Sequence, residues 1–166
     1  MQPVDSSVSV RPVASTSAGI LLFRLAGNEI EVLLVHPGGP FWAKKDAGAW
    51  SIPKGEVEDG EEPLACALRE LEEELGTPFS FAPEELTELG SVRQKGGKVV
   101  HCWAAQGEFD PAGLHSNTFT MEWPPRSGVK REFPEVDRAD WFGDEQAKEK
   151  INPAQAEFLD RLAANS

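Results

Sequence analysis

The chain has 166 residues, and its 28 acidic residues outnumber its 16 lysine and arginine residues, which gives a formal net charge of −12. This length suits one domain and is short for two independent hydrophobic cores. Because 40% of the residues are hydrophobic, the composition excludes a disordered chain. The acidic charge argues against a protein that binds nucleic-acid polymers.

No stretch of the sequence predicts export or membrane insertion. The longest apolar run, residues 19–23, is far shorter than the roughly 20 residues of a membrane-spanning helix. The N-terminus lacks a basic segment followed by an apolar stretch of signal-peptide length. Cys66 and Cys102 cannot form a disulfide framework, and their apolar neighbours indicate reduced, buried thiols. We therefore expect a cytoplasmic protein with no membrane partner.

The first third of the sequence predicts a flexible arm, a β-hairpin and a short strand. Residues 1–14 have no periodicity, so we expect a flexible arm before one domain over residues 15–166. Residues 16–25 and 30–36 are rich in strand-forming residues and flank a turn sequence with asparagine and glycine. The elements that we expect next are a loop over residues 36–48 and a strand over residues 50–52, ended by Pro53.

The rest of the sequence mixes helices and strands without regular βαβ units. Residues 64–75 have a helical pattern, and the following Gly76 and Pro78 are typical of a helix end. The mixture indicates the α+β class. The other expected elements are a hairpin over residues 86–94 and 99–106, an irregular region over 109–131 with one strand at 118–123, a last strand at 139–142, and helices near 145–150 and 153–164.

Three carboxylates share one edge of the helix expected at residues 64–75. At about 100° per residue, Glu70, Glu73 and Glu74 fall within an arc of about 100° beside the apolar face. Glu72 points away from this edge, and we expect it to be a solvated surface residue. Because like charges on adjacent turns repel each other, the cluster predicts a divalent cation site, and hard oxygen ligands suit Mg²⁺ or Mn²⁺.

The residues before and within this helix follow a fixed spacing. Gly55 lies six residues before Glu61, and Glu61 lies eight residues before Arg69, which opens the run Arg-Glu-Leu-Glu-Glu-Glu-Leu-Gly. The pattern over residues 55–77 resembles the Nudix box, G-x5-E-x7-R-E-U-x-E-E-x-G-U, in which U is an aliphatic residue. It departs at the last position, where Thr77 replaces an aliphatic packing residue.

This resemblance implies the Nudix fold, an α/β/α sandwich around a mixed β-sheet in a single domain. It also implies hydrolysis of a nucleoside diphosphate linked to another group, with Mg²⁺ or Mn²⁺ as cofactor. Arg69 is then expected to orient a carboxylate, and Glu61 to steady the loop or the helix start. The residues that match the family's metal ligands are Glu70, Glu73, Glu74 and, through its carbonyl group, Gly55.

The general base for the attacking water has two kinds of candidate. One is a glutamate of the box, Glu73 or Glu74. The other is Glu135, whose spacing before an aromatic strand is similar to that in asymmetrical diadenosine tetraphosphate hydrolases of the Nudix family, which use such a glutamate as metal ligand or base. Glu122 and Glu132 compete with Glu135 for this role.

Four residues near the box are candidates for substrate binding. Lys54 directly precedes the box glycine, and we expect it and Lys45 to contact phosphates. Phe41 and Trp42 lie in a glycine- and proline-rich loop, where an aromatic ring is free to stack on a nucleobase. The three histidines have no partners at metal-ligand spacing and are expected to be structural.

The expected function is a metal-dependent pyrophosphohydrolase that acts on a nucleotide or dinucleoside polyphosphate. Nucleoside triphosphates, ADP-ribose and inositol pyrophosphates stay open as substrates, because loops outside the box select the substrate. The alternative is a catalytically silent Nudix-fold protein that binds a nucleotide and regulates another molecule. The intact set of Arg69, Glu70, Glu73 and Glu74 favours the enzyme. The sequence does not predict the oligomeric state.

Overall fold

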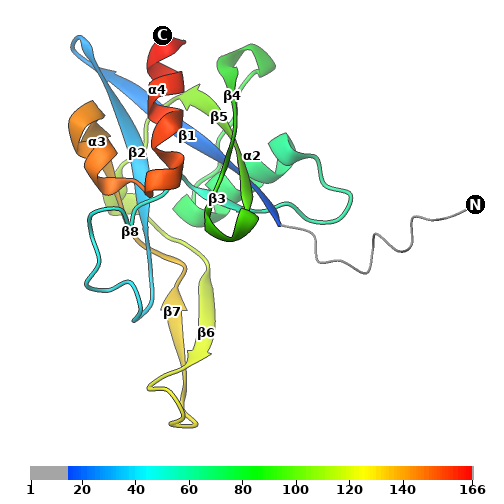
Figure 1. Cartoon of the computed structure of the whole chain (residues 1–166), viewed down its shortest axis with the longest axis vertical. Helices are drawn as coiled ribbons and strands as arrows, with labels where there is room; N and C mark the ends of the chain where they lie inside the picture. Colours follow the sequence, from blue (N-terminus) through cyan, green and yellow to red (C-terminus); the bar gives the residue numbers. More distant parts are fainter. Residues whose placement is uncertain (1–14, 166) are drawn as a thin grey trace, which may run out of the picture.

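The computed structural model describes residues 15–165, so the expected arm over residues 1–14 lies outside the described residues. A six-stranded sheet forms the centre of the molecule (Figure 1). Its strands are β1 (Thr16–Ala26), β2 (Glu29–Pro37), β3 (Lys54–Glu56), β4 (Leu86–Arg93), β5 (Val99–Gln106) and β8 (Val136–Gly143). The order is β4-β5-β1-β2-β8, and β3 also pairs with β1. Because β1 and β5 are parallel and the other pairs antiparallel, the sheet is mixed.

Both expected hairpins are confirmed. β1 pairs with β2, and Gly27 lies in their turn at a φ of 66°, a conformation that glycine adopts without a steric penalty. β4 pairs with β5 in the second hairpin. The expected last strand at residues 139–142 is also present, as part of the longer β8.

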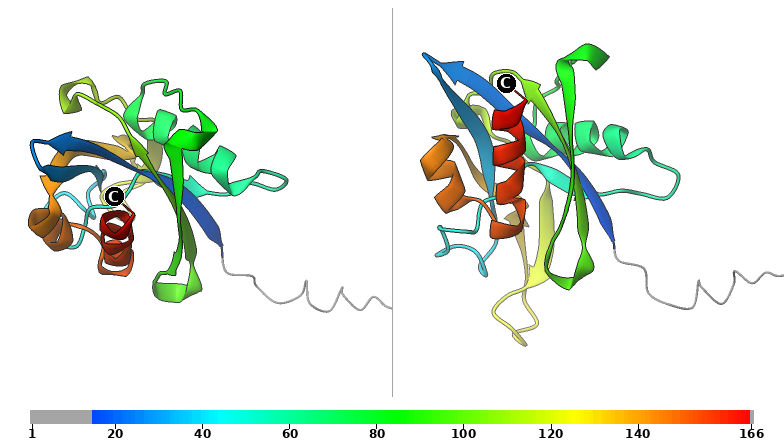
Figure 2. Two further views of the ribbon diagram at one scale, coloured as in Figure 1. Left: turned by 90° about the horizontal axis from the view of Figure 1, so that it is seen from above. Right: turned by 45° about the horizontal axis from the view of Figure 1, so that its top comes forward.

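Helices cover both faces of the sheet, as Figures 1 and 2 show. Helix α2 (Pro63–Leu75) lies on one face, and α3 (Asp144–Lys150) and α4 (Ala156–Ala164) lie on the other. The α/β/α sandwich that the sequence resemblance implied is therefore present. Within residues 15–165, no helix combines the length and apolar character needed to cross a membrane.

Helix α2 is bounded by the signals that the sequence contains. It begins at Pro63. Proline has no backbone N–H, but an N–H in the first turn has no partner within the helix, so no hydrogen bond is lost there. It ends at Gly76, whose φ of 76° allows its N–H to donate to the carbonyl oxygen of Glu72. The bounds of the carboxylate-bearing helix were thus predicted correctly.

The central strand β1 contributes to two core layers, because successive side chains of a strand point to opposite faces. Ile20 and Leu22 pack in the layer that contains Leu71 of α2. Leu21 packs in the other layer, with Phe158 of α4. All five side chains have no solvent exposure. The helix that carries the carboxylates is therefore fixed to the middle of the sheet.

The prediction of a strand over residues 50–52 is wrong. These residues make only isolated bridges to Val35 and Ile151. The strand in this region is β3, which begins after Pro53 and pairs with β1. Proline lacks the N–H that a continuous ladder needs, although the Pro53 carbonyl still accepts from the Ile20 N–H at 3.1 Å.

The prediction that residues 109–131 form one strand only is also incomplete. The strand expected at 118–123 is β6 (Thr118–Glu122), and it pairs with a strand that the sequence did not predict, β7 (Lys130–Pro134). Together they form a separate hairpin that extends from the body of the molecule (Figure 1). β7 was missed because its sequence, Lys-Arg-Glu-Phe-Pro, is charged and lacks an alternating apolar pattern.

Two further predictions concern the helices. The helix expected near residues 145–150 is α3, and the pattern over 153–164 consists of a 3₁₀ turn followed by α4. The expectation that Glu72 is a solvated surface acid is incomplete, because its side chain is only partly exposed. Its carboxylate accepts a hydrogen bond from the Phe79 N–H at 2.9 Å and so fixes the chain after α2.

We expect Leu71→Ala to lower the free energy of unfolding by about 2–5 kcal/mol, because it removes a fully buried leucine that anchors α2. Urea denaturation measures this loss. Leu25→Ala is the matched control, because Leu25 is 59% exposed, and its expected effect is about 0.5 kcal/mol or less. Equal losses for the two variants would contradict the role of Leu71 in holding the helix.

Candidate active site

Most of the expected site residues line one open hollow of about 600 Å³. Its walls come from α2, β3, the loop after β2, the start of β6, and the residues on either side of the β6–β7 hairpin. Residues far apart in the sequence thus meet at one place. The expected site residues that line the hollow are Trp42, Lys54, Gly55, Arg69, Glu70, Glu73, Glu74 and Glu135.

Gly55 allows a carboxylate to lie directly against β3. A Cβ atom at this position would lie 2.0 Å from Cδ of Glu70 and 2.3 Å from each of its carboxylate oxygens. No side chain larger than hydrogen fits there unless Glu70 moves. The box glycine therefore determines where the Glu70 carboxylate stands.

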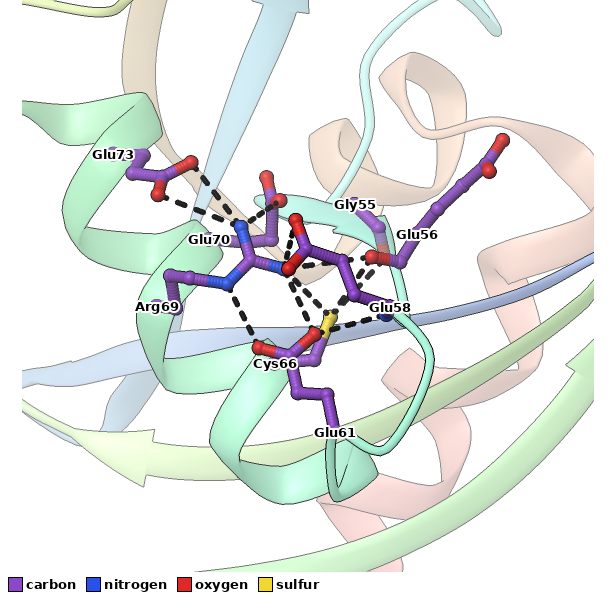
Figure 3. A network of polar contacts seen from close by, with 8 residues as sticks. All are labelled: Gly55, Glu56, Glu58, Glu61, Cys66, Arg69, Glu70 and Glu73. Atoms are coloured by element: carbon purple, nitrogen blue, oxygen red, sulfur yellow. Dashed lines mark hydrogen bonds and ion pairs between the residues drawn. The ribbon is translucent and has the colours of Figure 1, made fainter.

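Arg69 binds carboxylates on both sides of its guanidinium group, as Figure 3 shows. Its Nε lies 2.8 Å from Glu61, and its Nη1 lies 2.8 Å from Glu70 and 3.3 Å from Glu73. The hydrogen bonds from Arg69 and from the Glu58 N–H lower the pKa of Glu61 to about 2. Glu61 thereby ties the loop before α2 to Arg69, which agrees with the loop-steadying role expected for it.

The thiol of Cys66 also contacts the box loop, a contact that the sequence did not reveal. Its Sγ lies 3.5 Å from the Gly55 carbonyl oxygen and 3.4 Å from that of Glu56. Burial raises the pKa of Cys66 to about 11, so the group stays a protonated donor at neutral pH. Cys66 and Cys102 are both free and buried, as predicted.

Burial has the largest effect on the pKa values of the inner carboxylates, Glu70 and Glu74. Burial, together with the charge of Glu70, raises the pKa of Glu74 to about 8. Burial also raises the pKa of Glu70, against the opposing effect of Arg69. The pKa of Lys54 is lowered, because burial disfavours its charged form more than the neighbouring carboxylates favour it. The cluster thus holds more carboxylate groups than its own cations neutralise.

The donor chemistry of this cluster fits a hard divalent cation. In the described part of the chain, no three histidine, cysteine, aspartate or glutamate side chains already form a complete metal site. Arg69 instead holds oxygens of Glu70 and Glu73. Carboxylate oxygens and the Gly55 carbonyl are nevertheless the ligand types that Mg²⁺ and Mn²⁺ prefer.

Of the three later glutamates considered as the general base, Glu122, Glu132 and Glu135, one lines the hollow. Glu135 lines the hollow together with the box glutamates. Glu122 accepts a hydrogen bond from the Gly128 N–H, and Glu132 accepts one from the Thr118 hydroxyl at 2.9 Å. These two belong to the β6–β7 hairpin and do not line the hollow, so Glu135 is the one that the fold places there.

The four candidate substrate-binding residues also differ in whether they line the hollow. Trp42 and Lys54 line the hollow, whereas Phe41 and Lys45 do not. The Phe41 ring packs edge-on against Trp123, with 5.5 Å between the ring centroids. The Lys45 ammonium group lies 5.0 Å from the centre of the Trp42 ring. Phe41 and Lys45 therefore contact the aromatic residues around the hollow rather than its interior.

His36 holds the loop that carries Trp42. It is fully buried, and its Nδ1 lies 2.8 Å from Asp137 of β8. Its Nε2 lies 2.7 Å from the carbonyl oxygen of Lys45. These contacts agree with the structural role expected for His36, and they connect the loop after β2 to the strand that follows Glu135.

A family model described as "NUDIX domain" matches residues 14–162. The chain belongs to the Nudix hydrolase family. It is 30% identical over 127 residues to an RNA pyrophosphohydrolase of Agrobacterium fabrum, which covers 69% of each chain. It is 29% identical over 134 residues to a nucleoside triphosphate pyrophosphatase/Nudix hydrolase fusion protein of Bifidobacterium longum, covering 75% of this chain and 26% of that protein. The chain therefore spans about a quarter of this fusion protein.

Solved structures of other Nudix proteins share the fold. A binary complex of the Caenorhabditis elegans Ap4A hydrolase aligns with a TM-score of 0.61 and 23% identity, covering 90% of this chain and 96% of that one. The NUDIX domain of Shewanella oneidensis NrtR, in complex with ADP ribose, aligns with a TM-score of 0.64 and 14% identity over 99% of both chains. At these identities the likeness establishes the shared fold.

We expect Arg69→Gln to lower the free energy of unfolding by about 1–3 kcal/mol, because it removes the charged hydrogen bonds to three partly buried glutamates. Adding Mg²⁺ should restore part of this loss. Urea denaturation with and without Mg²⁺ measures both effects. Lys148→Gln, which removes exposed ion pairs to Asp144 of α3 and Asp160 of α4, is the control with an expected loss of about 1 kcal/mol or less. Equal losses of unfolding free energy in the two variants would contradict the role of Arg69 in holding the carboxylates together.

Proposed function

We propose that this Nudix hydrolase is a Mg²⁺- or Mn²⁺-dependent pyrophosphohydrolase that cleaves a phosphoanhydride bond of a nucleoside diphosphate linked to another group. The observation that carries the proposal is the meeting of Glu70, Glu73, Glu74 and Glu135 in one hollow. The names of the Agrobacterium and Bifidobacterium relatives support a reaction at pyrophosphate bonds.

The charge of the hollow supports the metal requirement. A pyrophosphate group is densely anionic, and it would meet several carboxylates with only Arg69 and Lys54 among the lining cations. Glu70, Glu73 and Glu74, with the Gly55 carbonyl, are the residues that would hold the cation. A bound divalent cation would neutralise the phosphates, lower the pKa of the attacking water and stabilise the leaving phosphate.

We assign the general base to Glu135, with Glu73 and Glu74 as the alternatives inside the box. The backbone of Glu135 is held on both sides. Its N–H donates to the Asn117 carbonyl at 2.8 Å, and its carbonyl accepts from the Gly38 N–H at 3.0 Å. A base must be fixed within hydrogen-bond reach of the water that it deprotonates, and these backbone contacts provide that restraint.

The remaining residues of the hollow suit the two ends of a nucleotide. We assign Lys54 to the phosphates and Trp42 to the nucleobase. Lys45 contacts the Trp42 ring, and Phe41 packs against Trp123 beside the hollow. A dinucleoside polyphosphate or a nucleoside triphosphate is the proposed substrate. A panel of nucleotides, ADP-ribose, dinucleoside polyphosphates, an inositol pyrophosphate and triphosphorylated RNA, with products identified by mass, tests this assignment.

The alternative is a protein that binds a nucleotide without turnover and regulates another molecule. The intact set of Arg69, Glu70, Glu73 and Glu74, with Glu135 in the same hollow, favours the enzyme, since a binding protein has no need of a base. If every substrate of the panel binds with Mg²⁺ but none is hydrolysed, the binding protein is the correct description.

We expect Glu74→Gln to lower kcat by at least about 100-fold, because loss of a metal ligand should exceed the 10- to 100-fold loss typical of residues behind the ligands. Steady-state kinetics with Mg²⁺ measures the effect, and EDTA should abolish the wild-type activity. Glu72→Gln is the matched control on the same helix, because its amide oxygen can still accept from the Phe79 N–H. Near-normal activity of Glu74→Gln would overturn the proposed metal site.

We expect Glu135→Gln to lower kcat by about 10²- to 10⁴-fold, the range for general acid–base groups, while KM changes little. Glu132→Gln serves as the control, because Glu132 lies in the hairpin and contacts Thr118. Should Glu135→Gln leave kcat unchanged, the base belongs to the box, and Glu73→Gln becomes the variant to measure.

A further inference from the structure

The β6–β7 hairpin has one aromatic face and one polar face. The register pairs Phe119 with Phe133 and Met121 with Arg131, and the Trp123 N–H donates to the carbonyl oxygen of Val129 at 2.9 Å. Paired residues of antiparallel strands share a face of the sheet. We call the set Phe119, Met121, Trp123, Val129, Arg131 and Phe133 the aromatic face. The polar face consists of Thr118, Thr120, Glu122, Lys130, Glu132 and Pro134.

The aromatic face packs against the loop after β2. Phe119 lies so close to Gly39 that a Cβ atom there would stand 2.9 Å from the Cζ atom of its ring. Further along the hairpin, Trp123 meets the ring of Phe41 at an interplanar angle of 81°. A two-stranded hairpin is only marginally stable alone. These contacts therefore fix the hairpin and the loop to each other as one wall.

This wall continues directly into the carboxylate cluster. Phe119 of β6 and Trp42 of the loop line the same hollow as the four glutamates. Trp42 keeps 40% of its surface exposed, and Phe41 keeps 60%. Large exposed aromatic side chains gathered at one place are a mark of a binding surface. The hollow is thus lined by both acidic and aromatic side chains.

The charge of the hairpin tip is opposite to that of the chain as a whole. Residues 124–131 contain Arg126, Lys130 and Arg131 and no acidic residue, in a chain with a net charge of −12. A surface with aromatic rings and positive charge suits a ligand with a flat ring system and phosphates. A polyphosphate without a base can use only the positive charge and not the aromatic rings, because phosphate groups have no π-face.

We propose that the β6–β7 hairpin is the specificity element of this enzyme, and that Phe119, together with Trp42, stacks on the nucleobase of a nucleotide bound in the hollow. The inference rests on the proposed function and narrows its substrate class. Nucleotides are bound in preference to base-free pyrophosphates such as inositol pyrophosphates. Because every base has a π-face, stacking of this kind tolerates several bases.

Binding of two non-hydrolysable probes tests this proposal. One is α,β-methylene-ADP, and the other is methylenediphosphonate, which keeps the P–C–P link without the nucleoside. Titrations followed by ³¹P NMR in Mg²⁺ give both affinities. We expect Phe119→Ala to weaken binding of the nucleotide probe by about 5- to 100-fold, the range for loss of one base stack, without a change for methylenediphosphonate.

Two further variants make the result specific to the ring. Phe119→Leu keeps an apolar side chain against Gly39 and Phe133 but removes the π-face, and we expect the same selective loss. Thr120→Ala lies on the polar face of the same strand and should bind both probes as the wild type does.

The outcomes separate the two proposals. Equal weakening of both probes by Phe119→Leu, or unchanged binding of the nucleotide probe, would overturn the role of the hairpin and leave the metal site intact. Failure of the wild-type protein to bind either probe in Mg²⁺ would contradict the proposed function as well.

Discussion

The contact between the Arg69 guanidinium and three glutamates is the interaction on which the site depends. Carboxylates on one edge of a helix repel each other, and Glu70 is moreover partly removed from water. Arg69 supplies a positive charge within the cluster, and through Glu61 it also fixes the loop that precedes α2. Gly55 then determines the place of the Glu70 carboxylate. The architecture thus holds negative charge in place before any external cation arrives.

The two sides of the hollow are supported differently. The carboxylate side belongs to α2, which is anchored by fully buried leucines on the central sheet. The aromatic side consists of a loop and a hairpin, held by His36, by the Phe41–Trp123 contact and by backbone hydrogen bonds of Glu135. Core packing therefore positions the box carboxylates of α2, whereas contacts of the loop and the hairpin position Glu135 and the aromatic side chains.

Local signals account for what the sequence predicted well. The bounds of α2, the two sheet hairpins and the edge shared by Glu70, Glu73 and Glu74 follow from periodicity, capping residues and turn residues. The strand β7 and the position of Phe119 depend on pairing across an irregular segment, for which the sequence contains no pattern. The Glu72 contact with Phe79 likewise depends on how the chain turns after the helix. Motif spacing identified the carboxylate side of the hollow, and tertiary pairing created its aromatic side.

The mutual support of the β6–β7 hairpin and the loop after β2 has a consequence for how such a protein diverges. The described contacts of the aromatic face are with Gly39 and Phe41 rather than with the two core layers beside the sheet. Natural variation in these two segments would therefore leave the core layers and α2 undisturbed, as long as the backbone hydrogen bonds of Glu135 to Gly38 and Asn117 are kept. Related proteins with the same box could therefore evolve toward other substrates by changing the β6–β7 hairpin and the loop after β2 together.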